Sequence, residues 1–189
     1  MKPLCPTRWV LTSATGVVAG MMSLAPPSVH AQQTADKDRE ISVRVRNGET
    51  EGGLILSARA TAKEVGLPLY PGAIPHKDEG KNDSAGKFGL WSNSFGFKLV
   101  VLTMESPDAL KKVAEFYQKA LARYGTVLDC TNAGAAAPHN EDTDRLTCAD
   151  DRPERGETLL KVGNKRRQHI VNIQPNGSGT IFQLVYIET

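Results

Sequence analysis

Apolar and polar residues alternate with a period of two along most of the chain from residue 41 onward. This alternation predicts β-strands, because successive side chains of a strand point to opposite faces of its sheet. The segments expected to be strands are residues 41–45 and 54–56, two strands within 87–104 joined around 92–94, and then 126–130, 145–149, 158–162, 169–173 and 180–187. Glycine and asparagine lie between several of them, which is typical of hairpin turns and predicts an antiparallel meander.

A helix is predicted over residues 107–124, where apolar residues recur at spacings of three and four. These apolar positions are Leu110, Val113, Ala114, Tyr117, Ala120, Leu121 and Tyr124. Charged and amide side chains occupy the other side, so the helix has one face for a core and one for solvent. We expect Ser106 to cap the helix, Pro107 to take its first position and Gly125 to end it in the left-handed conformation.

Together these elements predict an α+β fold: an antiparallel β-sheet meander with one long amphipathic helix packed on one face, plus an amino-terminal hairpin. Residues 67–73 contain a Pro71-Gly72 pair suited to a type II turn and should form a rigid corner at the edge of the core. Residues 181–187 are apolar on both faces of their strand. Their second face needs a cover, and we favour the hairpin that begins at Ile41 over another subunit.

The amino terminus has the pattern of a secretion signal. Lys2 and Arg8 form a basic start, residues 9–24 form an apolar core, and Val29-His30-Ala31 fits a small-x-small cleavage site. An uncleaved membrane anchor is the alternative, because the apolar stretch is close to the shortest that spans a bilayer. We interpret this region as a cleaved signal, which places the protein in the periplasm or outside the cell.

Cleavage divides the chain and changes its charge. The parts are a signal peptide at 1–31, a flexible polar leader at 32–40 and a single α+β domain at 41–189. Removing the signal takes away Lys2 and Arg8 but no acidic residue, so the net charge falls from +2 to zero. A neutral chain has no general attraction for nucleic acid or an anionic membrane, so neither is expected as a partner. No stable membrane span is expected after cleavage.

Two cysteines, Cys130 and Cys148, are left once Cys5 has gone with the signal. Disulfides persist outside the cytoplasm, and this is the only pair available, so we expect a disulfide between two neighbouring strands. Free thiols that serve redox or metal chemistry are the alternative. Neither cysteine has the adjacent cysteine or basic neighbours that would activate a thiol.

Several segments occur in an order shared with a known group of proteins. They are Gly66 to Ala73 with its Leu-Pro-Leu-Tyr-Pro-Gly-Ala core, Ser106-Pro107-Asp108, residues 116–121, Tyr124-Gly125, Cys130, Cys148 and residues 168–171. In these segments the chain resembles a family of exported bacterial proteins of uncharacterised function with an LPxYPGA signature. The resemblance covers about residues 41–186 and implies an exported single domain. It implies no catalytic residue.

Motifs of known enzyme classes are missing from the sequence, which has no nucleophile elbow, zinc-protease motif, phosphate-binding glycine loop or Cys-x-x-Cys. Residues 139–144 offer an imidazole and oxygen ligands but lack the spacing of a calcium loop, so a solvated loop is favoured. A charged loop also explains His76 beside Asp78 and Glu79. His169 alternates with apolar neighbours, as a structural histidine does. We assign no catalytic residue, no metal ligand and no cofactor.

A basic cluster is the first candidate ligand contact. Lys165, Arg166 and Arg167, together with Lys161, should form a positive patch at a hairpin tip. Such a patch suits an anion or a polymer of the cell envelope. A solvated turn is the alternative.

Aromatic residues are the second candidate. Tyr70, with Trp91, Phe95 and Phe97, could line a groove for a peptide or glycan. Aromatic side chains this close to strand patterns belong to a core more often than to a binding site, and that alternative stays open.

The function predicted from these observations is that of an exported, non-enzymatic binding or structural domain of the cell envelope. Its ligand is unknown, and its partner is an envelope protein or polymer. Homodimerisation through the sheet of the doubly apolar final strand is a further hypothesis. The alternative function is a small envelope hydrolase or lyase that uses His76 or His139 with nearby carboxylates.

Overall fold

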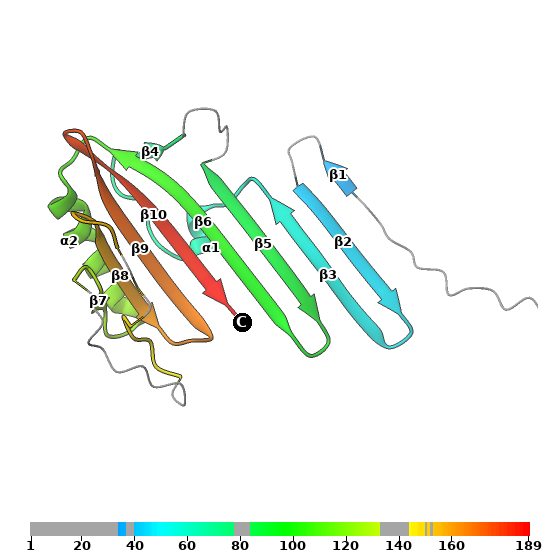
Figure 1. The fold of residues 1–189 in the computed structure, drawn as a ribbon. Coiled ribbons are helices and arrows are strands. Elements are labelled where there is room, and N and C mark those ends of the chain that lie inside the picture. Colours follow the sequence, from blue (N-terminus) through cyan, green and yellow to red (C-terminus); the bar gives the residue numbers. More distant parts are fainter. Residues whose placement is uncertain (1–33, 37–39, 78–83, 133–143, 150, 152) are drawn as a thin grey trace, which may run out of the picture.

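The computed structural model describes residues 34–36, 40–77, 84–132, 144–149, 151 and 153–189 (Figure 1). The predicted signal peptide lies outside these residues. Thr34–Asp36, within the predicted leader, forms strand β1, which pairs with the start of the next strand.

The described chain is mostly antiparallel β-sheet with some helix. Its strands are β1 Thr34–Asp36, β2 Glu40–Asn47, β3 Thr50–Ser57, β4 Ile74–Pro75, β5 Ala85–Ser92, β6 Gly96–Ser106, β7 Leu128–Asp129, β8 Thr158–Gly163, β9 Arg167–Asn176 and β10 Gly179–Glu188. They form one sheet in the order β1-β2-β3-β5-β6-β10-β9-β8-β7, and β4 pairs with β6. Figure 1 shows this sheet as a single layer, so the predicted antiparallel sheet is confirmed.

The amino-terminal hairpin, β2 and β3, extends the sheet at its edge. Residues 52–57 of β3 pair with residues 87–92 of β5, so the hairpin lies beside β5 in the same layer. The prediction that this hairpin folds across the second face of the final strand is therefore wrong. The physical reason is that β5 offers β3 a free row of backbone hydrogen-bonding groups, and the pairing satisfies both strands.

Two α-helices and one 3₁₀ turn lie among the described residues: α1 Ala62–Val65, α2 Leu110–Leu121 and η1 Ala122–Tyr124. α2 contacts β8, β9 and β10, and α1 contacts β6 and β10. α2 buries Val113, Tyr117 and Leu121, which lie on the predicted apolar face. The helix has 12 residues and is shorter than the predicted segment 107–124.

The predicted start of the helix is wrong. Ser106 is the last residue of β6, where it pairs with Thr180, and Ala109 takes the N-cap position without a side-chain hydrogen bond. The Thr180 hydroxyl donates to the Asp108 backbone carbonyl at 2.7 Å, which keeps the chain at the sheet edge past Pro107. At the other end, Gly125 has φ 135° and ψ −161°, which is not the left-handed helical conformation that was predicted.

The corner after α1 agrees with its prediction. The Ala73 backbone N–H donates to the Tyr70 carbonyl at 3.0 Å, and Gly72 between them has φ 75°, as the third residue of a type II turn requires. α1 was not predicted. Thr61 and Glu64 form a reciprocal capping box at its start, and Gly66 ends it with φ 77°.

Two predicted strands differ in the structure. Of residues 126–130 only Leu128–Asp129 is a strand, and residues 145–149 contribute only one isolated bridge, from Arg145 to Asn164. β7 and the Cys130 N–H, which donates to the Leu159 carbonyl, already occupy the edge of β8. The later segment therefore finds no edge there to pair with.

The register of the strands assigns every side chain to one of two faces. Residues opposite each other in neighbouring strands share a face, and successive residues alternate. We call the side covered by α1 and α2 the helix face. Its buried core consists of Val65, Leu67, Tyr70, Val100, Leu102, Met104, Val113, Tyr117, Leu121, Leu160, Val162, Val171, Ile173, Phe182, Leu184 and Tyr186. The other side of the sheet has no helix on it among the described elements.

Burial of α2 generates the first prediction. Leu121→Ala should lower the free energy of unfolding by about 2 to 5 kcal/mol, because Leu121 is fully buried. Lys119→Ala, on the exposed side of the same helix, is the matched control and should change it by no more than about 0.5 kcal/mol. Urea unfolding measures both. Equal, small effects would contradict the assigned face.

Candidate functional site

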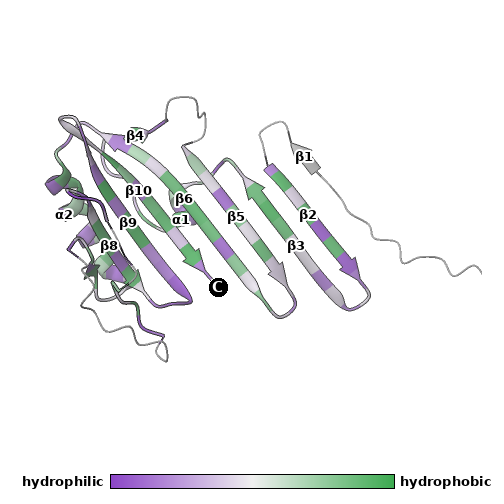
Figure 2. Cartoon of the chain, viewed as in Figure 1, coloured by the Kyte–Doolittle hydropathy of each residue, from purple (hydrophilic) through white to green (hydrophobic). Residues whose placement is uncertain are grey.

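The side of the sheet opposite the helices presents a continuous apolar surface. We call it the open face and define it by Ile41, Val43, Val45, Leu54, Leu56, Phe88, Leu90, Phe97, Leu99, Val101, Val185 and Ile187. These residues lie in aligned rows across β2, β3, β5, β6 and β10. One row, for example, runs from Ile41 through Leu56, Phe88 and Leu99 to Ile187. Figure 2 shows hydrophobic residues recurring along the same strands.

Large side chains of the open face are exposed to solvent. Leu56 is 49% exposed, Ile41 43%, and Val45 and Leu90 41% each. A contiguous apolar surface of this kind is uncommon on a monomeric protein and marks a site of interaction. The open face is therefore the candidate functional site.

The opposite side of the same hairpin is charged. Arg44 and Arg46 both pair with Glu51, and Lys87 of β5 pairs with Glu64 of α1 at 3.0 Å. Apart from Ile55, the large apolar side chains of β2 and β3 thus point away from the helices, while the charged ones point to the helix face. Burial among the described residues does not account for that arrangement.

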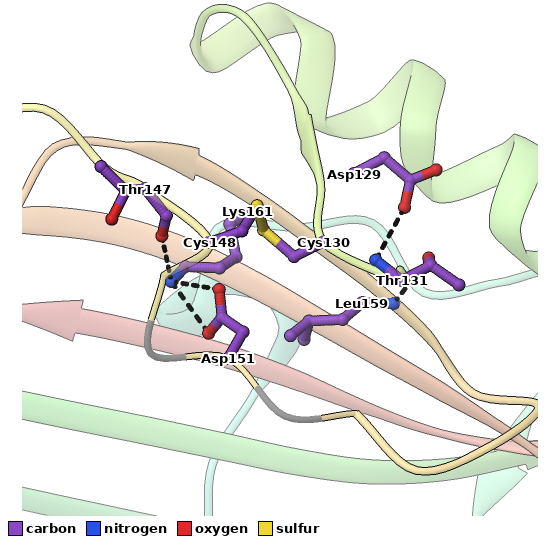
Figure 3. Close-up of a disulfide and its surroundings, with 8 residues drawn as sticks. All are labelled: Asp129, Cys130, Thr131, Thr147, Cys148, Asp151, Leu159 and Lys161. Carbon is purple, nitrogen blue, oxygen red and sulfur yellow. Dashed lines mark hydrogen bonds and ion pairs between the residues drawn. A yellow bond between two sulfur atoms is a disulfide. The ribbon is translucent and has the colours of Figure 1, made fainter. Parts of the chain in front are cut away.

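At the β8 end the chain covers the open face itself. The register places Lys161 on this face, opposite Ile170 of β9. Thr147 and Asp151 lie over it: the Lys161 ammonium donates to the Thr147 carbonyl at 3.2 Å and pairs with the Asp151 carboxylate at 3.0 Å (Figure 3). Lys161 is only 9% exposed, so this cover excludes most solvent.

The predicted disulfide holds the cover in place. Cys130 and Cys148 are bonded, with their Cα atoms 5.3 Å apart (Figure 3). Cys130 follows β7 and is fully buried, whereas Cys148 belongs to the covering segment. The bond therefore joins the sheet edge to the segment above it, and not two paired strands as predicted. Asp151 lies beside the two sulfur atoms, but cysteines joined to each other offer no thiolate to a metal.

The four basic residues predicted as one patch are separated. Lys161 is buried against Asp151, while Lys165 and Arg166 are exposed in the turn between β8 and β9 and Arg167 is exposed at the start of β9. Arg167 forms an ion pair with Glu188, which raises the pKa of Arg167. Hydrogen bonds from the Tyr186 hydroxyl and from Arg167 lower the pKa of Glu188.

The aromatic candidates do not form one groove. Tyr70 is 9% exposed in the core, its hydroxyl donates to the Asp108 carboxylate at 2.7 Å, and its N–H donates to the Tyr117 hydroxyl at 3.2 Å. The hydrogen bond to Asp108 raises the pKa of Tyr70. Phe97 lies on the open face, and Phe95 lies in the turn before β6.

Trp91 lines a groove of its own on the helix face. The groove has a volume of about 470 Å³ and is bordered by Ile55, Lys87, Gly89 and Lys98. The Trp91 ring lies over Gly53, where the missing side chain makes room for it. This groove had no clear signal in the sequence, because only the pairing of β3 with β5 brings Gly53 opposite Trp91.

The two histidines of the described residues are both engaged. The Nδ1 atom of His76 lies 2.5 Å from the Glu105 carboxylate. His169 is 5% exposed and stacks on Tyr124, with ring centroids 4.1 Å apart. Asp78, Glu79 and residues 139–143, which complete the other predicted acidic groups, lie outside the described residues.

His169 is held in its neutral form by its surroundings. Burial lowers its pKa, a hydrogen bond to the Val65 carbonyl acts in the opposite direction, and the positive charges of Arg123 and Arg167 lower it further. These contacts join β9 to the end of α1. They are the contacts of a structural histidine.

Comparison of the chain with protein-family models, curated proteins and solved structures found no match. Within the described part of the chain, no helix is long and apolar enough to cross a membrane. The site must therefore be interpreted from its own geometry.

The disulfide generates the second prediction. Replacing both Cys130 and Cys148 by serine opens a link between residues 18 positions apart and should lower the free energy of unfolding by about 3 kcal/mol, measured by urea unfolding. Wild-type protein under reducing conditions is the control and should match the double variant. An unchanged urea midpoint in the double variant would contradict a stabilising role of the disulfide.

His169 generates the third prediction. Its pKa is lowered in the fold, so between that value and the ordinary value of about 6.5 the unfolded chain binds more protons. The contribution of His169 to the free energy of unfolding is therefore fully present above about pH 6.5 and is lost as the pH falls below that value. His169→Phe, which keeps an aromatic ring in place, should lose less stability than wild type between about pH 7.5 and about pH 5.5.

Thermal unfolding across this pH series measures the difference. Titrating groups that are common to both proteins cancel in the comparison. Parallel pH profiles for the two proteins would contradict the buried, neutral state of His169.

Proposed function

We propose that this protein is an exported, non-enzymatic binding or structural domain of the cell envelope that associates with a protein partner through the open face. The observation that carries the proposal is the exposure of a continuous apolar face on a sheet whose helices both lie on the opposite side, against β6, β8, β9 and β10. Water contact with such a face is unfavourable by about 25 cal/mol per Å², so covering it stabilises a complex.

The chemistry of the open face favours a protein partner over an envelope polymer. Its defining residues are aliphatic or aromatic, and none carries a hydrogen-bonding side chain. Polysaccharides and other polar polymers need donors and acceptors at their binding site, whereas a protein surface supplies apolar side chains to match.

Export is supported by the basic start, apolar core and small-residue cleavage site of the first 31 residues. The disulfide supports it as well, because such bonds persist in oxidising compartments. The resemblance to exported proteins with the LPxYPGA signature is in accord with both. The Tyr-Pro-Gly-Ala part of that signature forms the corner that seats Tyr70 in the core.

Site-specific photo-cross-linking in living cells tests this proposal. A photoreactive phenylalanine analogue at Leu56, 49% exposed on the open face, should give a discrete adduct after illumination. The same analogue at Leu69, 45% exposed in the segment 67–73, is the matched control and should give little or none.

Leu90→Lys, which places a charge on the open face, should remove the Leu56 adduct, because a buried unpaired ammonium is strongly unfavourable. Adducts of equal yield at Leu56 and Leu69, or none at Leu56, would overturn the proposal. Leu69→Lys is the control for Leu90→Lys and should leave the Leu56 adduct unchanged.

A further inference from the structure

The size of the open face matches one side of a stable protein interface. Neighbouring strands lie about 4.8 Å apart, and residues on one face of a strand recur about every 6.8 Å, so each residue of the face covers about 33 Å². The flat projection of the twelve defining residues is therefore roughly 390 Å². The accessible surface follows the side chains and exceeds the projection, which brings it to the scale of the roughly 800 Å² per partner of a standard interface.

The open face is also compatible with itself. None of its defining residues is charged. Two copies related by a two-fold axis would therefore bring no like charges together, and each would offer the other the same apolar rows. The defining residues therefore do not require a partner of opposite charge.

The layers of the fold leave room for such a pairing. α1 and α2 both lie on the helix face, so two open faces can approach without obstruction from either helix (Figure 1). Two stacked antiparallel sheets pack about 10 Å apart with their strands about 30° from parallel. The product is a four-layer arrangement with helices outside and a β-sandwich core inside.

The cover over Lys161 sets one limit of the interface. Thr147 and Asp151 already occupy this side of the sheet at β8, so a second copy meets the part from β2 to β10. The side chains that face outward on β10, which include Val185 and Ile187, then become buried on their second side. This accounts for a final strand that is apolar on both faces.

From these observations we infer that the open face binds the open face of a second copy of this chain. The inference rests on the proposed function and names the protein partner. The partner contributes half of a hydrophobic core that neither copy completes alone.

Sedimentation velocity of the purified exported protein over a range of concentrations tests the inference. We expect a concentration-dependent species of twice the chain mass. Leu56→Lys and Leu90→Lys should each raise the dimer dissociation constant at least tenfold, while Leu69→Lys, of similar exposure, should leave it within about twofold. The far-ultraviolet circular dichroism of each variant checks folding.

A second measurement does not depend on charged variants. Wild-type protein carrying the photoreactive analogue at Leu56 should give an adduct whose two peptides both come from this chain, with the partner peptide drawn from the open face. A monomer at all concentrations, or homotypic adducts that map elsewhere, would overturn the inference.

Failure of this inference differs from failure of the proposed function. A Leu56 adduct to a different envelope protein, with the purified chain monomeric, rejects the second copy and leaves the proposed function standing. No Leu56 adduct of any kind rejects both. Co-sedimentation of the protein with phosphatidylethanolamine and phosphatidylglycerol vesicles, abolished by Leu56→Lys, would reject both in favour of a lipid surface.

Discussion

Packing of Tyr117 and its neighbours on α2 against the sheet fixes the layout of the whole molecule. The Tyr117 ring lies 5.4 Å from that of Phe182 on the central strand β10, and its hydroxyl accepts the N–H of Tyr70 from the corner after α1. This one cluster draws both α-helices and the corner to the same side of the sheet. Since both α-helices pack on the helix face, the other side of the sheet can be buried only by other segments of the chain or by a partner.

Among the residues that the structure describes, the chain covers the other side at the β8 end. The Cys130–Cys148 bond ties Cys148 and the nearby Thr147 and Asp151 over β8, where Lys161 would otherwise place a charge on an apolar surface. Its pairing with Asp151 satisfies that charge, and breaking a buried pair of this kind leaves an uncompensated ion. The open face therefore begins where this cover ends, and its defining residues are uncharged. The disulfide shapes the candidate site without taking part in it.

Local patterns predicted the strands well, because period two follows directly from side chains that alternate across a sheet. The buried face of α2 was also readable from Val113, Tyr117 and Leu121. The start of α2 was not, since the Thr180 hydroxyl, 72 residues from its acceptor Asp108, holds that segment in the sheet. The open face was not predicted as a site, because it too depends on contacts between distant parts of the sequence. The sequence showed that β10 is apolar on both faces, but it did not show that β3 pairs with β5. Ile41, Leu56 and Leu90 align only after that pairing is known.

The central claim is that the open face is covered in the associated protein and bare in the separated one. Methyl NMR with a soluble paramagnetic probe measures this directly, residue by residue, as the protein is diluted. The account predicts that the methyl groups of Leu56 and Leu90 are shielded from the probe at high concentration and become accessible on dilution, while those of Leu69 stay accessible throughout. Equal accessibility of all three residues at every concentration would contradict it.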